Sequence, residues 1–124
     1  MPVITAPSQP THDRGGTSFT SLATPSRGSR ETSVWSVAIA PGTPAVPHAL
    51  TREEVFVVLA GSASVKLDGV PATAGVGDAI VAPAEVSFEL ANESDEELRL
   101  LCCMPVDGQA RLEDGTVMSP PWAQ

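Results

Sequence analysis

Apolar and polar residues alternate along several segments in the middle of the chain. In residues 34–40, the large side chains of Trp35, Val37 and Ile39 fall at every second position, with small residues between them. Residues 86–90 alternate in the same way. Because successive side chains of a strand point to opposite faces of its sheet, this period of two predicts β-strands with one buried face.

The segment 97–104 alternates as well, and the residues on one face are Leu98, Leu100, Cys102 and Met104. The opposite face begins with a charged pair, so we expect Cys102 to face the interior. Turns rich in glycine, proline and aspartate separate the predicted strands at intervals of roughly 8–12 residues, and no convincing helical period is present. This pattern predicts an all-β antiparallel barrel or sandwich.

The first 33 residues are rich in proline, serine, threonine and glycine, with few large apolar side chains. We therefore expect residues 1–33 to form an N-terminal arm, flexible or docked, and residues 34–124 to form a β-barrel domain. Residues 19–22 alternate and predict a short strand that docks on the main sheet. Near the other terminus, Trp122 is expected to fix the tail against the body.

The chain has 124 residues and a formal net charge of −8. This length fits one domain that buries enough surface to form a core. Nucleic-acid binding requires clustered lysine and arginine, and anionic membrane surfaces repel an acidic protein, so we expect neither as a partner. Neutral and cationic small molecules remain compatible with this charge.

Cys102 and Cys103 are neighbours in the sequence. Adjacent residues of a strand point to opposite faces, and a disulfide between them would be strained, so we expect two reduced thiols. The N-terminus has no basic segment followed by an apolar run, and no stretch approaches the ~20 apolar residues of a membrane span. These features predict a cytoplasmic protein.

A proline-rich turn and the strand after it carry a motif of fixed spacing. Its residues are Gly42, His48, Leu50, Glu54 and Gly61. The spacing resembles the first conserved motif of the cupin superfamily, G-x5-H-x-H-x3,4-E-x6-G. Leu50 stands where that motif has its second histidine.

A second motif follows after a short connecting segment. Gly77, Pro83 and Asn92 are in register with the second cupin motif, G-x5-P-x-G-x2-H-x3-N. Glu85 replaces its second glycine, and Phe88 replaces its histidine. Because the two motifs occur in order at the usual separation, the resemblance extends over residues 35–104.

The resemblance to small single-domain cupins implies a double-stranded β-helix, the jelly-roll barrel of that family, with an N-terminal arm. It also implies a homodimer formed through sheet edges and exchanged arms. In the family, three histidines and a glutamate from the two motifs hold a divalent transition metal. Here His48 and Glu54 match ligand positions, whereas Leu50 and Phe88 cannot coordinate a metal. A metal would need further ligands, such as Cys102, His12 or a substrate oxygen.

The alternative is a metal-free pocket in which His48 and Glu54 are the polar working pair and act as catalytic residues. Its expected apolar lining is Leu50, Phe56, Val58, Phe88, Leu90 and Cys102. Apolar walls with a few convergent polar groups are typical of small-molecule sites. If the imidazole and the carboxyl lie within hydrogen-bond reach, they could transfer protons during isomerisation, dehydration or cyclisation of an apolar substrate.

Other readings of the same residues stay open. The protein could be a metal-dependent oxygenase or isomerase with a reduced ligand set, or a non-catalytic module that binds a small molecule. His48 could also be a core histidine bonded to Glu54. Leu50 and Phe88 could simply fill a barrel that has no cavity.

Overall fold

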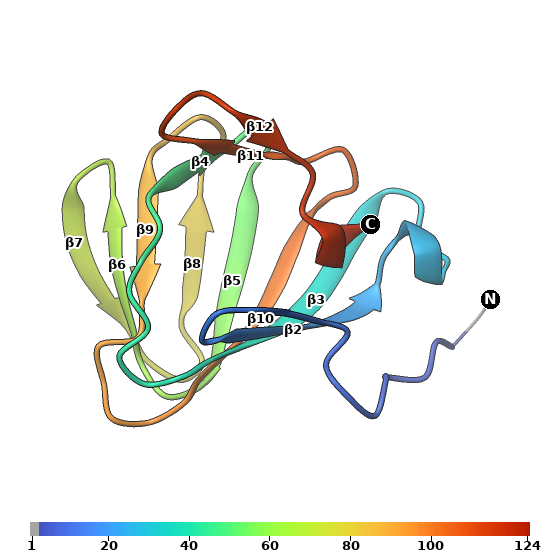
Figure 1. Ribbon diagram of the computed structural model, residues 1–124, viewed down its shortest axis with the longest axis horizontal. Helices are drawn as coiled ribbons and strands as arrows, with labels where there is room; N and C mark the ends of the chain where they lie inside the picture. Colours follow the sequence, from blue (N-terminus) through green and yellow to red (C-terminus); the bar gives the residue numbers. More distant parts are fainter. Residues whose placement is uncertain (1–2) are drawn as a thin grey trace.

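Two antiparallel sheets of six strands each face one another in the computed structural model, which describes residues 3–124 (Figure 1). The order in sheet A is β1-β2-β3-β10-β5-β8, and the order in sheet B is β12-β11-β4-β9-β6-β7. The predicted all-β jelly-roll barrel is therefore confirmed. Residues 3–124 contain no helix with the length and hydrophobicity that crossing a membrane requires.

Sheet A consists of β1 (His12–Arg14), β2 (Thr17–Ala23), β3 (Thr32–Ile39), β5 (Glu54–Ala60), β8 (Ala79–Ala82) and β10 (Leu98–Pro105). Sheet B consists of β4 (His48–Leu50), β6 (Ala63–Leu67), β7 (Val70–Ala74), β9 (Phe88–Ala91), β11 (Ala110–Leu112) and β12 (Val117–Met118). Two short 3-10 helices, η1 (Pro25–Arg27) and η2 (Pro121–Ala123), lie outside the sheets.

The core lies between the sheets and is built around β10, which pairs with both β3 and β5. Cys102 on β10 is opposite Trp35 on one side and Phe56 on the other. Trp35 is only 2% exposed, and the inward residues of all three strands are buried. Burial of these large apolar side chains is the main favourable contribution to folding.

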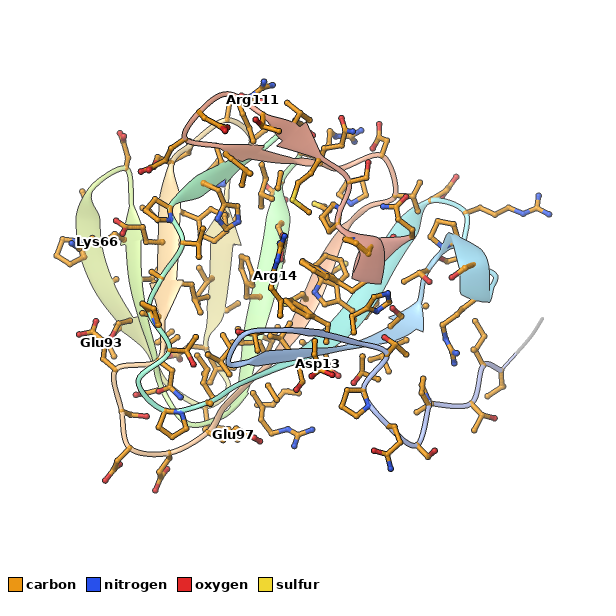
Figure 2. The ribbon with its side chains drawn as sticks, in the orientation of Figure 1. Asp13, Arg14, Lys66, Glu93, Glu97 and Arg111 are labelled. Carbon is orange, nitrogen blue, oxygen red and sulfur yellow. The ribbon has the colours of Figure 1, made fainter. Side chains whose placement is uncertain are left out.

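Residues 12–23, within the predicted arm, form β1 and β2 at the edge of sheet A. The C-terminal tail fastens this edge, because the ring of Trp122 stacks on Phe19 with 3.7 Å between centroids. The Ser21 hydroxyl donates to the Trp122 carbonyl at 2.7 Å. The guanidinium of Arg14, labelled in Figure 2, lies 5.8 Å from the centroid of the Trp122 ring. Trp122 thus fixes the tail, as the sequence predicted.

The asparagine of the second motif, Asn92, has a structural role. Asn92 is fully buried, and its side-chain amide donates to the backbone carbonyls of Ile39 at 3.0 Å and Glu96 at 2.7 Å. Its carbonyl oxygen accepts from the backbone amide of Ser94 at 3.1 Å. Asn92 therefore joins the end of β9 to the end of β3, and satisfies backbone groups that would otherwise be buried without partners.

Removal of the Trp122 side chain tests this anchoring. We expect Trp122→Ala to lower the free energy of unfolding by roughly 2 kcal/mol, because both the ring stack and part of the buried apolar area are lost. Trp122→Phe should retain most of the stability. Urea unfolding curves measure both variants, and a change below about 0.5 kcal/mol for Trp122→Ala would contradict the anchoring role.

Candidate functional site

The residues of the two motifs meet at the interior faces of both sheets. β4 places His48 and Leu50 on the same face, and His48 pairs with Phe88 at the start of β9. Across the interior, the ring of Phe88 lies 5.6 Å from that of Phe56 on β5, measured between centroids. Glu54 lies two positions before Phe56 and so points into the same space. The fold thus brings Phe88 beside both His48 and Phe56, and it places Glu54 on the inward face of the strand that carries Phe56.

His48 is held in one tautomer by the backbone. Its Nδ1 lies 2.7 Å from the carbonyl oxygen of Val46, and because a carbonyl only accepts, Nδ1 carries the proton. Nε2 is then left with a free lone pair in the neutral ring. Burial lowers the pKa of His48, although the bond to Val46 opposes this shift. The half-buried imidazole is therefore neutral at pH 7, with Nε2 available as a base.

Glu54 has the opposite shift. The side chain is 6% exposed, and burial raises its pKa to about 8, with only a hydrogen bond from Cys102 to oppose it. Burial and the neighbouring carboxyl raise the pKa of Cys102 as well. At pH 7 Glu54 is thus mainly a neutral carboxylic acid that can donate a proton, and Cys102 is a thiol rather than a thiolate nucleophile.

No hydrogen bond joins His48 and Glu54 in the part of the chain that the structure describes. His48 bonds to Val46, and its ring lies 4.3 Å from that of Phe88 between centroids. Glu54 instead contacts Cys102 on the adjacent strand. The two groups belong to opposite sheets, so the distance between them depends on how the sheets pack and not on their spacing in sequence.

Most of the predicted pocket lining is tightly packed. Leu50, Phe56, Val58, Phe88 and Cys102 are buried, and Leu90 is half-buried. Two open cavities of about 390 and 330 Å³ lie along β6 and β7, and neither has His48 or Glu54 in its wall. The aromatic rings therefore fill the space beside His48, and a ligand that reaches both polar groups must displace them.

The residues present do not form a metal site of the kind that the motif resemblance implies. Within residues 3–124 no group of three or more His, Cys, Asp or Glu side chains is arranged to hold a metal ion. His12, considered above as an additional ligand, lies on the edge strand β1 with its Nδ1 2.9 Å from the Thr11 hydroxyl. Cys102 contacts Glu54, but the hydrocarbon of Phe88 packs against His48.

One feature of the loop before β9 escaped the sequence reasoning. Glu85 adopts φ 64°, a left-handed conformation in which glycine is favoured, and this explains the glycine of the second motif at this position. Its backbone amide donates to the Leu50 carbonyl at 2.7 Å, and its carboxylate accepts from Arg111 at 3.1 Å. A non-glycine residue at a motif glycine is the signal that could have drawn attention to this contact.

The family model for the cupin domain matches residues 35–104, which is more than half of the chain. The chain belongs to the cupin family. The matched span has the same limits as the resemblance inferred from the two motifs, and it includes Glu54 and Phe88. A search of curated proteins found no significant match to this cupin.

Solved structures with the same fold include enzymes. The polyketide cyclase RemF from Streptomyces resistomycificus is 20% identical with TM-score 0.71, and the match covers 94% of this chain and 79% of RemF. KdgF from Halomonas sp. is 20% identical with TM-score 0.68, covering 78% of this chain and 86% of KdgF. Salicylate 1,2-dioxygenase from Pseudoaminobacter salicylatoxidans is 21% identical with TM-score 0.66, covering 77% of this chain and 26% of the dioxygenase. These similarities establish a shared fold.

The raised pKa of Glu54 has a measurable effect on stability. Because the folded state keeps this proton up to about pH 8 while the unfolded state releases it near pH 4.5, stability falls as pH rises through this interval. We expect Glu54→Gln, which cannot ionise, to be more stable than wild type by roughly 4 kcal/mol at pH 8, and similar to it near pH 4.5.

Urea unfolding at the two pH values measures this difference. The exposed neighbour Glu53 supplies the matched control, and Glu53→Gln should follow the wild-type pH dependence. If Glu54→Gln and wild type lose stability in parallel between these pH values, Glu54 does not carry the raised pKa.

Proposed function

We propose that this cupin catalyses proton transfer on an apolar carbonyl compound without a metal ion, using His48 as the base and Glu54 as the acid. The observation that carries the proposal is the opposite direction of their pKa shifts, lowered for the imidazole and raised to about 8 for the carboxyl. Paired groups whose surroundings separate their pKa values in this way are typical of acid-base sites.

The chemistry follows from the two protonation states. His48 Nε2 accepts a proton from the carbon next to the substrate carbonyl, while the Glu54 carboxylic acid donates its proton to the carbonyl oxygen. The product is an enol, with His48 protonated and Glu54 ionised. Return of the proton from His48 to the same carbon, and of the enol proton to Glu54, regenerates the substrate and exchanges its α-proton. In a β,γ-unsaturated substrate the enol is a dienol, and return of the proton to the γ-carbon instead moves the C=C bond into conjugation with the carbonyl and completes an isomerisation.

The placement of the two groups on opposite sheets supports this division of roles. Because the two groups are not bonded to each other, each can contact a different atom of a substrate that has displaced the aromatic rings beside His48. The surrounding side chains, Phe56 and Phe88 among them, are aromatic or aliphatic and favour an apolar substrate. Enol formation is also a step toward carbon-carbon bond formation, so the fold shared with the polyketide cyclase RemF makes aromatic β-diketones the first compounds to test.

The proposed acid and base predict a bell-shaped pH dependence of kcat/KM. Activity should fall on the acid side below the lowered pKa of His48, where Nε2 becomes protonated, and on the alkaline side above about pH 8, where Glu54 has lost its proton. The measurement is exchange of the α-protons of aromatic β-diketones with deuterated water, followed by NMR across pH 5–10.

His48→Gln and Glu54→Gln should each slow this exchange about 10²-fold or more, and Glu54→Gln should remove the alkaline limb. Glu53→Gln is the control and should resemble wild type. Binding of the diketones with no exchange above background would instead favour a non-catalytic binding module.

Metal content separates this proposal from a metal-dependent oxygenase or isomerase with a reduced ligand set. Since only His48 and Glu54 match ligand positions, we expect less than about a tenth of an equivalent of transition metal per chain after purification without chelators. Elemental analysis of wild type and His48→Ala tests this. Close to one metal per wild-type chain, lost in the variant, would overturn the metal-free proposal.

A further inference from the structure

The smaller of the two cavities, of about 330 Å³, lies where both sheets have a free edge. Its wall combines residues of β6 and β7 with residues 78–81, which form the start of β8 and the position before it. β7 is the last strand of sheet B and β8 the last of sheet A, and within residues 3–124 no further strand pairs with either of them. Figure 1 shows β7 at the outer left of the molecule. We call this opening the edge cavity.

The inward face of β7 is uncovered at the edge cavity. Val65 on β6 is buried, and its register partner on β7 is Ala72, so the two side chains point to the same face of sheet B. Ala72 is nevertheless exposed, and Val70, two residues earlier, is 67% exposed. Inward side chains of a two-sheet protein are normally covered by the opposite sheet. At the edge cavity this cover is missing, and an apolar recess is open to solvent.

The wall of the edge cavity is almost free of charge. Of the described residues that line it, Asp78 alone is charged, and its carboxylate accepts from the backbone amide of Gly75 at 2.8 Å. The larger cavity, of about 390 Å³, has Lys66, Glu89 and Glu93 in its wall. Figure 2 shows Lys66 and Glu93 at the periphery of the molecule. Because pockets of about 300–1,000 Å³ with mainly apolar walls are typical of small-molecule sites, the edge cavity fits a neutral apolar ligand better than the larger cavity does.

In sheet B, one row of inward side chains connects the edge cavity with the candidate site. Leu67, in the wall of the cavity, is opposite Phe88 in the strand register, and Phe88 is opposite His48. The rings of Phe88 and His48 lie 4.3 Å apart between centroids. Since neighbouring strands are spaced about 4.8 Å apart, ~10 Å separate Leu67 from His48, and the ring of Phe88 lies between them.

A second row makes the same connection in sheet A. Ile80, in the wall of the cavity, is opposite Phe56, and Phe56 is opposite Cys102. Cys102 in turn donates a hydrogen bond to Glu54. The rings of Phe56 and Phe88 lie 5.6 Å apart between centroids across the interior. The edge cavity is therefore on one side of this aromatic pair, and the two polar groups are on the other.

We propose that a neutral aromatic diketone enters the candidate site through the edge cavity, and that Leu67 and Ile80 form the gate that it passes. The inference rests on the proposed function and gives its substrate a route. Leu67 is half-buried and Ile80 is buried, so both separate the solvent from the aromatic pair. Rotation of Leu67 and then of the Phe88 ring brings the ligand from the cavity to Nε2 of His48. Asp78 in the wall and the net charge of −8 disfavour an anionic ligand.

Binding kinetics test the gate. A ligand passes a gate in both directions, so a change at the gate alters the association and dissociation rates together and leaves Kd nearly unchanged. We expect Ala72→Phe, which fills the mouth of the cavity, to lower both rates for 1-phenylbutane-1,3-dione by about tenfold or more, with Kd changed less than about threefold. Leu67→Ala, which widens the gate, should raise both rates by about threefold or more.

Stopped-flow quenching of tryptophan fluorescence measures these rates, because Trp35 is opposite Cys102 in the row that contains Phe56. Ala40→Phe is the matched control and should keep the wild-type rates. Ala40 is also an exposed alanine, but it follows β3 and lies in the wall of neither cavity. Circular dichroism establishes that each variant is folded, and if Ala72→Phe is not, the rates of Leu67→Ala decide.

Wild-type rates in the folded Ala72→Phe and Leu67→Ala variants would overturn the proposal. A change in the dissociation rate alone would overturn it too, since the altered residue would then be a contact of the bound ligand. Exchange of the α-protons of the diketone is measured separately on the same proteins. Normal binding without exchange removes the proposed catalysis and leaves the entry route in place, whereas exchange with unaltered rates in the variants removes the entry route alone.

Discussion

The double pairing of β10 with β3 and β5 is the constraint on which the rest of this structure depends. Since both neighbours are fixed to it in register, the alternation of one strand decides what both faces of sheet A present. Its inward residues place Cys102 among Trp35 and Phe56, beside the Glu54 carboxyl. Its outward residues place Leu101 and Cys103 on the outer face of sheet A. The candidate site and the outer face of sheet A are therefore opposite sides of one set of hydrogen-bonded strands.

Burial of the Glu54 carboxyl lowers the free energy of unfolding of the protein. A carboxyl whose pKa is raised to about 8 costs free energy at neutral pH, and the thiol of Cys102 is a weak hydrogen-bond donor that recovers little of it. A glutamine or an apolar residue at this position would avoid the cost. The large apolar core around Trp35 offsets it, and the strained, costly groups of a protein are concentrated at its functional sites. This reasoning favours a working role for Glu54 over that of a filler of the core.

The fold could be predicted well because the alternation of apolar residues and the spacing within each motif are both local patterns. Alternation over residues 97–104 correctly directed Cys102 inward, and the spacing of two motifs predicted the span 35–104 that the cupin family model matches. The distance between His48 and Glu54 was harder to predict, since it depends on how far apart the two sheets lie. It also depends on which neighbouring group each side chain bonds to. Nothing in the sequence indicates that the Val46 carbonyl fixes the imidazole tautomer.

Leu50 and Phe88 link the missing metal ligands to the chemistry that we propose. At these positions the family motifs have histidines, which would surround His48 and Glu54 with polar groups and a cation. A cation would hold the carboxyl ionised, because an opposite charge lowers its pKa. Hydrocarbon at the same positions brings no charge, the ring of Phe88 packs against His48, and burial lowers the pKa of the imidazole and raises that of the carboxyl. Leu50 and Phe88 thus remove two of the four ligand positions of a metal site. They also leave His48 and Glu54 in uncharged surroundings, in which these two residues can act as a base and an acid near neutral pH.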